Sequence, residues 1–173
     1  MRGAAKRLAA ATLILAAAAC SKPAESAQSS EPDPTVTVRK TDSVVLRARE
    51  DAMRTLPMFW RKFDAQEEGA SKFSVKVELS GPNGEEVVWM RVESREGEEI
   101  VGLLAVEPSR FPGLHLGSRI SVHSSRVTDW SYEKGGKVYG DYFTRAMIER
   151  APADIKAQVQ ATFAPTPTET SEN

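Results

Sequence analysis

The sequence has few of the residues that carry redox, metal or nucleophile chemistry. Its 173 residues include one cysteine, Cys20, and two histidines, His115 and His123. A single cysteine cannot form a disulfide within the chain, and a zinc site needs several cysteine or histidine ligands at short, regular spacings. The sequence also has no Gly-rich phosphate loop and no nucleophile elbow. We therefore expect the folded domain to hold no metal and no cofactor.

The chain has no excess of positive charge and no long apolar run. It contains 23 lysine and arginine residues against 24 aspartate and glutamate residues, for a net charge of −1. Nucleic-acid binding requires a strongly basic face, so nucleic acid is not an expected partner. The longest apolar run, residues 8–19, is shorter than the roughly 20 residues that a membrane-spanning helix needs.

The apolar run at the N-terminus has the pattern of an export signal. Arg2, Lys6 and Arg7 precede it, and it ends in Ala17-Ala18-Ala19 followed by Cys20. A basic segment, a short apolar run and small residues at its end are typical of a secretory signal peptide. We therefore expect residues 1–19 to be removed, which leaves 20 basic against 24 acidic residues and a net charge of −4.

A run of small residues that ends at a lone cysteine resembles the signal of bacterial lipoproteins. The resemblance implies that the Cys20 thiol receives diacylglycerol, that the leader is cut before Cys20, and that acyl groups such as palmitate hold the protein on a membrane. Each buried methylene would contribute about 0.8 kcal/mol to this attachment. Ser21 resembles the residue that follows the cysteine in outer-membrane lipoproteins, which implies an outer-membrane location facing the periplasm. Plain secretion, with Cys20 an ordinary thiol, is the alternative.

Residues 20–40 predict a flexible tether between the anchor and the domain. Residues 21–33 are rich in Ser, Pro, Ala and Glu and have no apolar periodicity, which is typical of disordered chain. Residues 35–40 alternate in polarity and fit either an edge strand or an extended linker. We expect the globular domain over residues 41–163 and a disordered tail over residues 164–173.

Periodicity within residues 41–163 predicts helices at both ends and strands between them. A helix capped by Asp42 or Ser43 is expected to end near Arg54. Pro57 then opens a second short helix, because the residue before a proline avoids the helical basin. Alternating or apolar runs predict strands at residues 73–79, 87–93, 100–106, from 117 onward, 128–133 and 137–142. Pro152 opens a last helix, and residues 141–150 fit either strand or helix.

The order of these elements predicts an α+β fold. We expect a strongly curved antiparallel sheet of about six strands, with the N-terminal helices on one face and a helix at the C-terminal end. A partly closed barrel is the alternative. Gly135 and Gly136 fit a two-residue hairpin turn, and this turn places Tyr132 opposite Tyr139.

Five short motifs are spread along the predicted sheet. They are Glu86 with Trp89, Gly102-Leu103-Leu104 before Glu107-Pro108, Leu116-Gly117, Asp129-Trp130-x-Tyr132, and Tyr139-Gly140-Asp141-Tyr142 with Thr144-Arg145. Together they are similar to the YegJ-type family, the domain of unknown function 2314, over residues 35–150. The resemblance implies a small α+β domain, often exported in a lipoprotein form. It implies no biochemical activity.

The candidate binding residues are polar and aromatic side chains of these motifs: Glu86, Trp89, Asp129, Trp130, Tyr132, Tyr139 and Arg145. Tryptophan and tyrosine combine an apolar body with a polar group, which suits recognition of a peptide, a glycan or a protein. The alternative is a structural role for the same residues. Trp130 and Tyr132 would then belong to the sheet core, Asp129 would cap a turn, and Arg145 would pair with a carboxylate.

Three functions are compatible with these features. The first is a lipid-anchored module of the cell envelope that binds a partner without catalysis. The second is an envelope hydrolase that uses Glu86 or Asp129, although nothing in the sequence places these carboxylates across a cleft. The third is a stress or inhibitor protein that blocks another protein with its loops.

Overall fold

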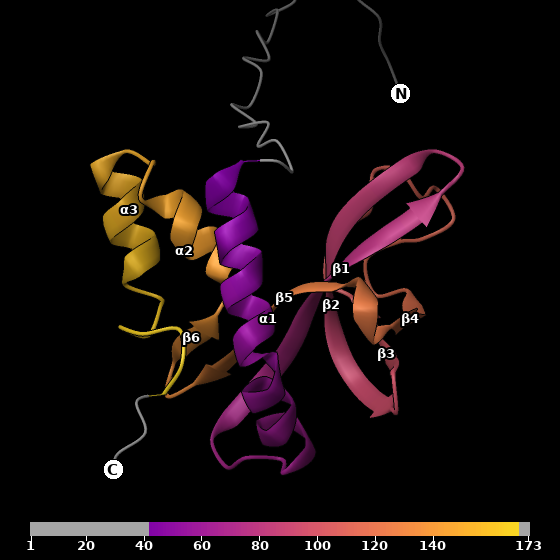
Figure 1. The fold of residues 1–173 in the computed structure, drawn as a ribbon, viewed down its shortest axis with the longest axis horizontal. Coiled ribbons are helices and arrows are strands. Elements are labelled where there is room, and N and C mark those ends of the chain that lie inside the picture. Colours follow the sequence, from indigo (N-terminus) through magenta and orange to yellow (C-terminus); the bar gives the residue numbers. More distant parts are fainter. Residues whose placement is uncertain (1–41, 170–173) are drawn as a thin grey trace, which may run out of the picture. The chain divides into compact units, whose positions relative to one another are not determined.

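The computed structural model describes residues 42–169, which form one α+β domain (Figure 1). Its elements in chain order are α1 (Ser43–Asp64), β1 (Ala70–Gly81), β2 (Gly84–Glu96), β3 (Glu99–Leu104), β4 (Arg119–His123), the 3-10 helix η1 (Ser124–Arg126), β5 (Val127–Lys134), β6 (Lys137–Gly140), α2 (Tyr142–Ile148) and α3 (Ala153–Gln160). The strands form one antiparallel sheet in the order β4-β3-β2-β1-β5-β6. The predicted fold class is confirmed, and the sheet is open, with β4 and β6 as its edges.

The predicted signal peptide, Cys20 and the tether, with its alternative edge strand at residues 35–40, lie outside the described residues. Within residues 42–169, no helix combines the length and the apolar character that crossing a bilayer requires.

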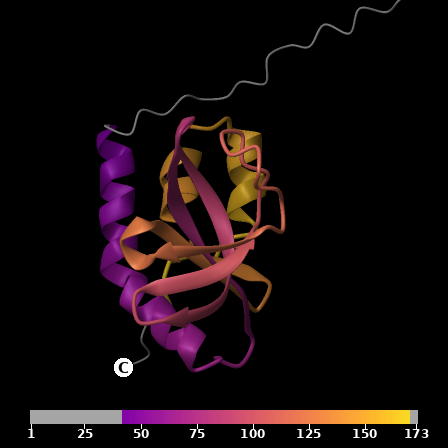
Figure 2. The ribbon, with the colours of Figure 1, turned by 90° about the vertical axis from the view of Figure 1, so that its right-hand side faces the viewer.

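Helix α1 runs through Pro57 without a break, so the prediction of two separate N-terminal helices is wrong. A proline inside a helix lacks an N–H and crowds the carbonyl four residues earlier, which bends the helix. Figure 2 shows α1 turning aside in its C-terminal half. Phe59 and Trp60 follow the proline directly and are buried in the core. Their packing holds this half of the helix in place, which the local sequence does not reveal.

The hairpin of β5 and β6 has the predicted turn and register. Gly135 and Gly136 connect the two strands and have φ angles of +58° and +72°, as a two-residue turn of this kind requires. Tyr132 pairs with Tyr139 across the hairpin. The two rings stack with their centres 5.1 Å apart.

Strand β6 ends at Gly140, two residues earlier than predicted, and residues 142–148 form helix α2. Asp141 caps this helix, since its side chain accepts a hydrogen bond from Thr144 N at 3.3 Å. The segment that fitted both strand and helix is therefore helical. Helix α2 packs against α1, and in Figure 1 it lies between α1 and α3.

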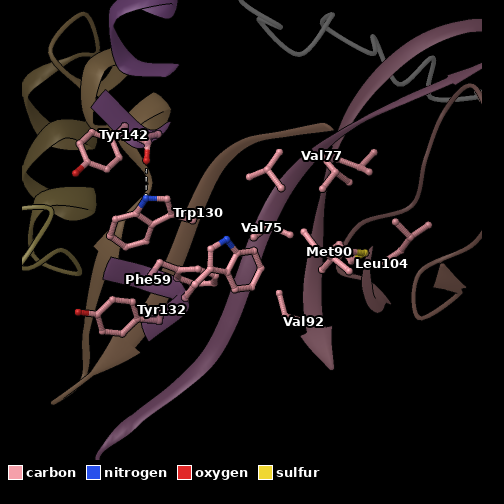
Figure 3. Packing of buried hydrophobic residues seen from close by; sticks show 14 of the residues in the cluster. Phe59, Val75, Val77, Met90, Val92, Leu104, Trp130, Tyr132 and Tyr142 are labelled. Atoms are coloured by element: carbon pink, nitrogen blue, oxygen red, sulfur yellow. Dashed lines mark hydrogen bonds between the residues drawn. The ribbon is translucent and has the colours of Figure 1, made fainter. Parts of the chain in front are cut away.

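The core lies between α1 and one face of the sheet (Figure 3). Along each strand, side chains that point into the core alternate with side chains that point to the opposite face. In β2, Val88, Met90 and Val92 are buried, as the sequence predicts. Strand β3 lies inside the sheet between β2 and β4, and its apolar run is buried at Ile100 and Leu104.

The C-terminal segment returns to the sheet after α3. Pro152 precedes α3 as predicted, but this helix has no buried residue. Beyond it, Val138 N donates to Thr162 O at 2.9 Å and Ala164 N donates to Val138 O at 3.0 Å. Ala164 is buried. Residues 164–169 therefore follow the outer edge of β6, whereas the sequence predicted a disordered tail from residue 164.

Candidate functional site

Three of the seven predicted binding residues are buried in the domain. Asp129, Trp130 and Tyr132 of β5 are exposed by 2%, 0% and 1%. Strand β5 lies between β1 and β6, and α1 packs across it. Trp130 and Tyr132 therefore cannot contact a ligand in this structure, and Asp129 is almost completely covered. The seven residues do not form one binding surface.

Trp130 and Tyr132 have structural partners for their polar atoms. Trp130 Nε1 donates to the backbone oxygen of Ala52 at 2.9 Å, which joins the sheet to α1. The Tyr132 hydroxyl donates to Glu169 Oε1 at 3.0 Å, which joins the sheet to the C-terminal segment. The predicted alternative, that both aromatics belong to the sheet core, describes their positions.

Asp129 holds the start of helix α2. Its Oδ1 accepts hydrogen bonds from Trp130 N at 2.8 Å and Tyr142 N at 3.2 Å, and its Oδ2 accepts one from Phe143 N at 2.9 Å. Burial raises the pKa of this carboxyl to about 6, although the N–H groups of Phe143 and Trp130 favour the ionised form. The raised pKa of Asp129 thus reflects its burial at the start of α2, where its role is to accept backbone N–H groups.

Glu86 holds the loop between β3 and β4. Its Oε1 accepts hydrogen bonds from Ser109 N at 2.9 Å and Ser109 Oγ at 3.0 Å, and its Oε2 accepts one from Arg110 N at 2.8 Å. Burial alone would raise the pKa of Glu86, but these hydrogen bonds outweigh it and lower the pKa. A carboxyl with a lowered pKa, both of whose oxygens are bound to this loop, is poorly suited to general acid catalysis.

Arg145 binds backbone carbonyls rather than a carboxylate. Its guanidinium donates to Gly140 O at 2.7 Å, Ala164 O at 2.9 Å and Val138 O at 2.9 Å. The same group lies over the ring of Phe163, 4.6 Å from the ring centre. Arg145 therefore joins α2 to the end of β6 and to the C-terminal segment, and the predicted carboxylate partner is wrong.

Trp89 lies on the face of the sheet opposite Trp130. In the register of the sheet, Lys76 of β1 pairs with Trp89 of β2 on one side and with Asp129 of β5 on the other. Side chains that are paired across neighbouring strands point to the same face. Trp89, Lys76 and Asp129 therefore share the face that is turned away from the main core, and only two of the seven predicted residues meet there.

This second face forms a groove with α1 and α2. The groove has a predominantly apolar lining and a volume of about 400 Å³. This volume lies within the range of roughly 300–1,000 Å³ that is typical of small-molecule pockets. The lining residues come from two helices and three strands: Val45, Leu46, Arg49, Lys76, Glu78, Val87, Thr128, Asp129 and Phe143.

Lys76 is the most unusual group of the groove. Its Nζ lies 4.2 Å from the centre of the Phe143 ring and 5.2 Å from the centre of the Trp89 ring. Burial lowers the pKa of Lys76, while the charges of Asp141 and Asp129 oppose this change. No hydrogen bond or ion pair joins Lys76 Nζ to the residues of the described domain. An ammonium in a partly apolar groove is thus available to a ligand.

The larger hollow beside β6 is a weaker candidate. It has a volume of about 860 Å³, but two of its three lysines are paired with carboxylates, and the third, Lys137, donates to Ala161 O at 2.6 Å. Lys62 lies 2.6 Å from Glu67, and Lys134 lies 2.5 Å from Glu67 and 3.1 Å from Glu169. In residues 42–169 there is also no group of three metal-ligating side chains.

The described residues form a small α+β domain with a largely apolar groove that contains a lysine. A family model matches residues 42–163 of this domain. The chain belongs to the family described as uncharacterised protein conserved in bacteria (DUF2314), which confirms the resemblance seen in the sequence motifs.

Two curated relatives match parts of the chain. Uncharacterized protein YegJ of Escherichia coli strain K12 is 21% identical over 92 residues, which are 53% of this chain and 60% of that protein. A putative ankyrin repeat protein of Neisseria meningitidis serogroup B is 30% identical over 118 residues, 64% of this chain and 47% of that protein. The chain thus spans less than two thirds of either relative. No solved structure matches it.

Proposed function

We propose that the protein is a lipoprotein of the bacterial cell envelope whose domain binds a ligand in the groove between α1 and the sheet. The groove is the observation that carries the proposal, because it leaves apolar side chains accessible next to a well-packed core. Leu46 and Val87, which line it, are exposed by 54% and 38%. Apolar side chains gathered in a concave site favour binding of an apolar ligand part.

The envelope location rests on the N-terminal sequence. A basic segment, an apolar run and a lone cysteine support export and lipid attachment at Cys20. Ser21 supports an outer-membrane location facing the periplasm. In this proposal the acyl chains hold the domain at the membrane, and the binding site is the groove rather than the buried aromatic residues of β5.

The hydrolase alternative has no supporting geometry in the described domain. Such a mechanism needs a carboxyl group that can reach a substrate. The oxygens of Glu86 bind the backbone of residues 109 and 110, and those of Asp129 bind two N–H groups at the start of α2 and the N–H of Trp130. No observation favours the inhibitor alternative either, so the binding module is the function that we develop.

Binding in the groove can be tested with a neutral apolar dye, N-phenyl-naphthylamine, whose emission rises in an apolar environment. The full chain should increase this emission, and Val87→Arg should reduce the increase because it places a charge in the groove lining. Val106→Arg is the matched control, since Val106 is exposed by 39% against 38% for Val87 and does not line the groove. Equal effects of the two substitutions would contradict the proposal.

The anchor has a separate test. The intact mass of the protein from the membrane fraction of a bacterium should correspond to a chain that begins at Cys20 and carries diacylglycerol and one further acyl group. Cys20→Ala should remove these groups. A chain with a free Cys20 thiol in the soluble fraction would support plain secretion and would contradict the lipoprotein proposal.

A further inference from the structure

We infer that the groove takes a single-chain amphiphile with a carboxylate head group, and that the ammonium of Lys76 binds this head group. The inference depends on the proposed function, because it names the class of ligand for the same groove. It follows from three properties of the lining: which polar groups are free, how Lys76 is held, and where the apolar side chains lie.

The groove offers two cationic donors, whereas its two carboxylates already have interactions within the protein. The Thr128 hydroxyl donates to Lys76 O at 3.2 Å, and both oxygens of Asp129 accept backbone N–H groups. Glu78 has an interaction of its own. The side chains of Lys76 and Arg49 make no hydrogen bond to the described part of the chain. A head group that only accepts hydrogen bonds, such as a carboxylate, therefore fits this set.

The surroundings of Lys76 make an ion pair with a ligand favourable. The rings of Phe143 and Trp89 cover the ammonium at 4.2 and 5.2 Å and exclude part of its water. A charge-assisted hydrogen bond is stronger where water is excluded than at an open surface. Asp129 and Asp141 also act on Lys76, but the oxygens of Asp129 are directed to the N–H groups of α2. A ligand carboxylate would supply the direct partner that these two aspartates do not.

The apolar part of the lining suits an acyl chain. Val45 and Leu46 of α1, Val87 of β2 and Phe143 of α2 supply the apolar part of the lining. Leu46 and Val87 are two of the large apolar side chains that the described domain exposes to solvent. Covering them is favourable because it removes apolar surface from water. The groove thus places the cations Lys76 and Arg49 beside apolar side chains, an arrangement that suits an anionic amphiphile.

The test compares three probes that share one chain and differ in head group: dodecanoate, dodecanol and dodecyltrimethylammonium. Calorimetric titration should use the full chain from residue 20 with Cys20→Ser, so that no acyl chain of its own competes, and probe concentrations below micelle formation. We expect dodecanoate to bind about tenfold or more tightly than dodecanol, as a charge-assisted hydrogen bond predicts. Dodecyltrimethylammonium should bind most weakly.

Lys76→Met removes the charge and keeps an unbranched apolar side chain. We expect it to weaken dodecanoate binding about ten- to hundredfold and to leave dodecanol binding within about twofold. Lys76 lies in a central strand, so Lys76→Met could also weaken binding by destabilising the fold. A second variant at an exposed groove residue avoids this problem. Arg49→Gln should weaken dodecanoate about two- to fivefold as the loss of an exposed charge. Arg47→Gln, on the same helix but outside the groove, should have no effect.

The outcomes separate the two proposals. If all three probes bind the full chain equally well and Lys76→Met changes nothing, the groove binds amphiphiles without a carboxylate preference, and the inference fails while the proposed function stands. If no probe binds, both fail. If, in addition, the chain is a dimer that Arg49→Gln separates, the groove belongs to a second copy of the chain.

Discussion

The indole N–H of Trp130 and the backbone carbonyl of Ala52 are joined by a hydrogen bond of 2.9 Å, although the two residues lie 78 positions apart. Both are fully buried. The preceding residue, Asp129, points to the opposite face of β5 and binds the first N–H groups of α2. Two neighbouring residues of one strand, with side chains on opposite faces, therefore fix the positions of α1 and of the start of α2.

Trp130→Phe should lower the free energy of unfolding by about 2–3 kcal/mol. The smaller ring leaves a cavity in a core that packs tightly around Phe59 and Tyr142. The substitution also removes the donor to Ala52 O, a loss of about 1 kcal/mol. Urea denaturation followed by circular dichroism measures the difference. Trp89→Phe is the control and should change stability by less than about 1 kcal/mol, because Trp89 is only half-buried. Equal losses would contradict the structure.

Asp129 should make the domain less stable as the pH rises from about 4 to 6. Burial raises the pKa of its carboxyl from 3.8 to about 6 in the folded state. Between these values the folded protein holds a proton that the unfolded chain releases, so stability decreases by about 1.4 kcal/mol for each pH unit. The total effect is about 3 kcal/mol. Above the folded pKa the contribution is constant.

Asp129→Asn isolates this effect because asparagine does not titrate. Groups such as Glu86, whose pKa is lowered on folding, give the opposite slope in both proteins and cancel in the comparison. Denaturation midpoints across this pH range should show the wild-type losing stability relative to the variant. The variant also carries a constant cost, because an amide cannot accept all three N–H groups that Asp129 binds. Parallel profiles would rule out the raised pKa.

Local patterns predicted much of the sheet. The hairpin with Gly135 and Gly136 and the pairing of Tyr132 with Tyr139 follow from turn chemistry and strand alternation, which are properties of short segments. The family motifs are also short segments, so the sequence alone reveals them. Helix α1 was mispredicted at Pro57 because the packing of Phe59 and Trp60 against distant strands outweighs the local preference.

The groove could not be predicted because its key contacts are distant in sequence. Lys76 occupies a polar position of an alternating strand, which indicates a solvent-exposed lysine. The ring of Phe143, from a segment that fitted both strand and helix, covers it in the folded domain. For Asp129, a capping role was one of the predicted alternatives, but its partners, Tyr142 and Phe143, depend on where β6 ends.

Gly140→Ala should lower the free energy of unfolding by about 3 kcal/mol or more. Gly140 has a φ of +72°, and a Cβ there would lie 2.2 Å from the Trp130 carbonyl oxygen and 2.5 Å from its ring. Both the left-handed conformation and the collision with backbone are unfavourable for alanine. Gly135→Ala in the same hairpin is the control. It has a φ of +58° but meets nothing within 4 Å, so we expect a loss of only about 1 kcal/mol. A similar loss at both positions would contradict the close packing at Gly140.

Removing residues 164–173 should destabilise the domain, whereas removing residues 170–173 should not. The longer truncation deletes the buried Ala164 and the hydrogen bond between Gly140 N and Pro167 O at 2.8 Å. It also deletes Glu169, which accepts a hydrogen bond from the buried Tyr132 and pairs with Lys134. A buried hydroxyl without a partner costs about 1–3 kcal/mol.

We therefore expect the chain that ends at residue 163 to lose about 2–4 kcal/mol of unfolding free energy, measured by thermal and urea denaturation. Glu169→Gln in the full chain separates the contributions. Because glutamine still accepts the Tyr132 hydrogen bond, this variant loses only partly exposed ion pairs and should cost less than about 1 kcal/mol. If the chain ending at 163 is as stable as the one ending at 169, the contacts of residues 164–169 with β6 contribute nothing to folding, and the sequence-based domain end at 163 is the correct one.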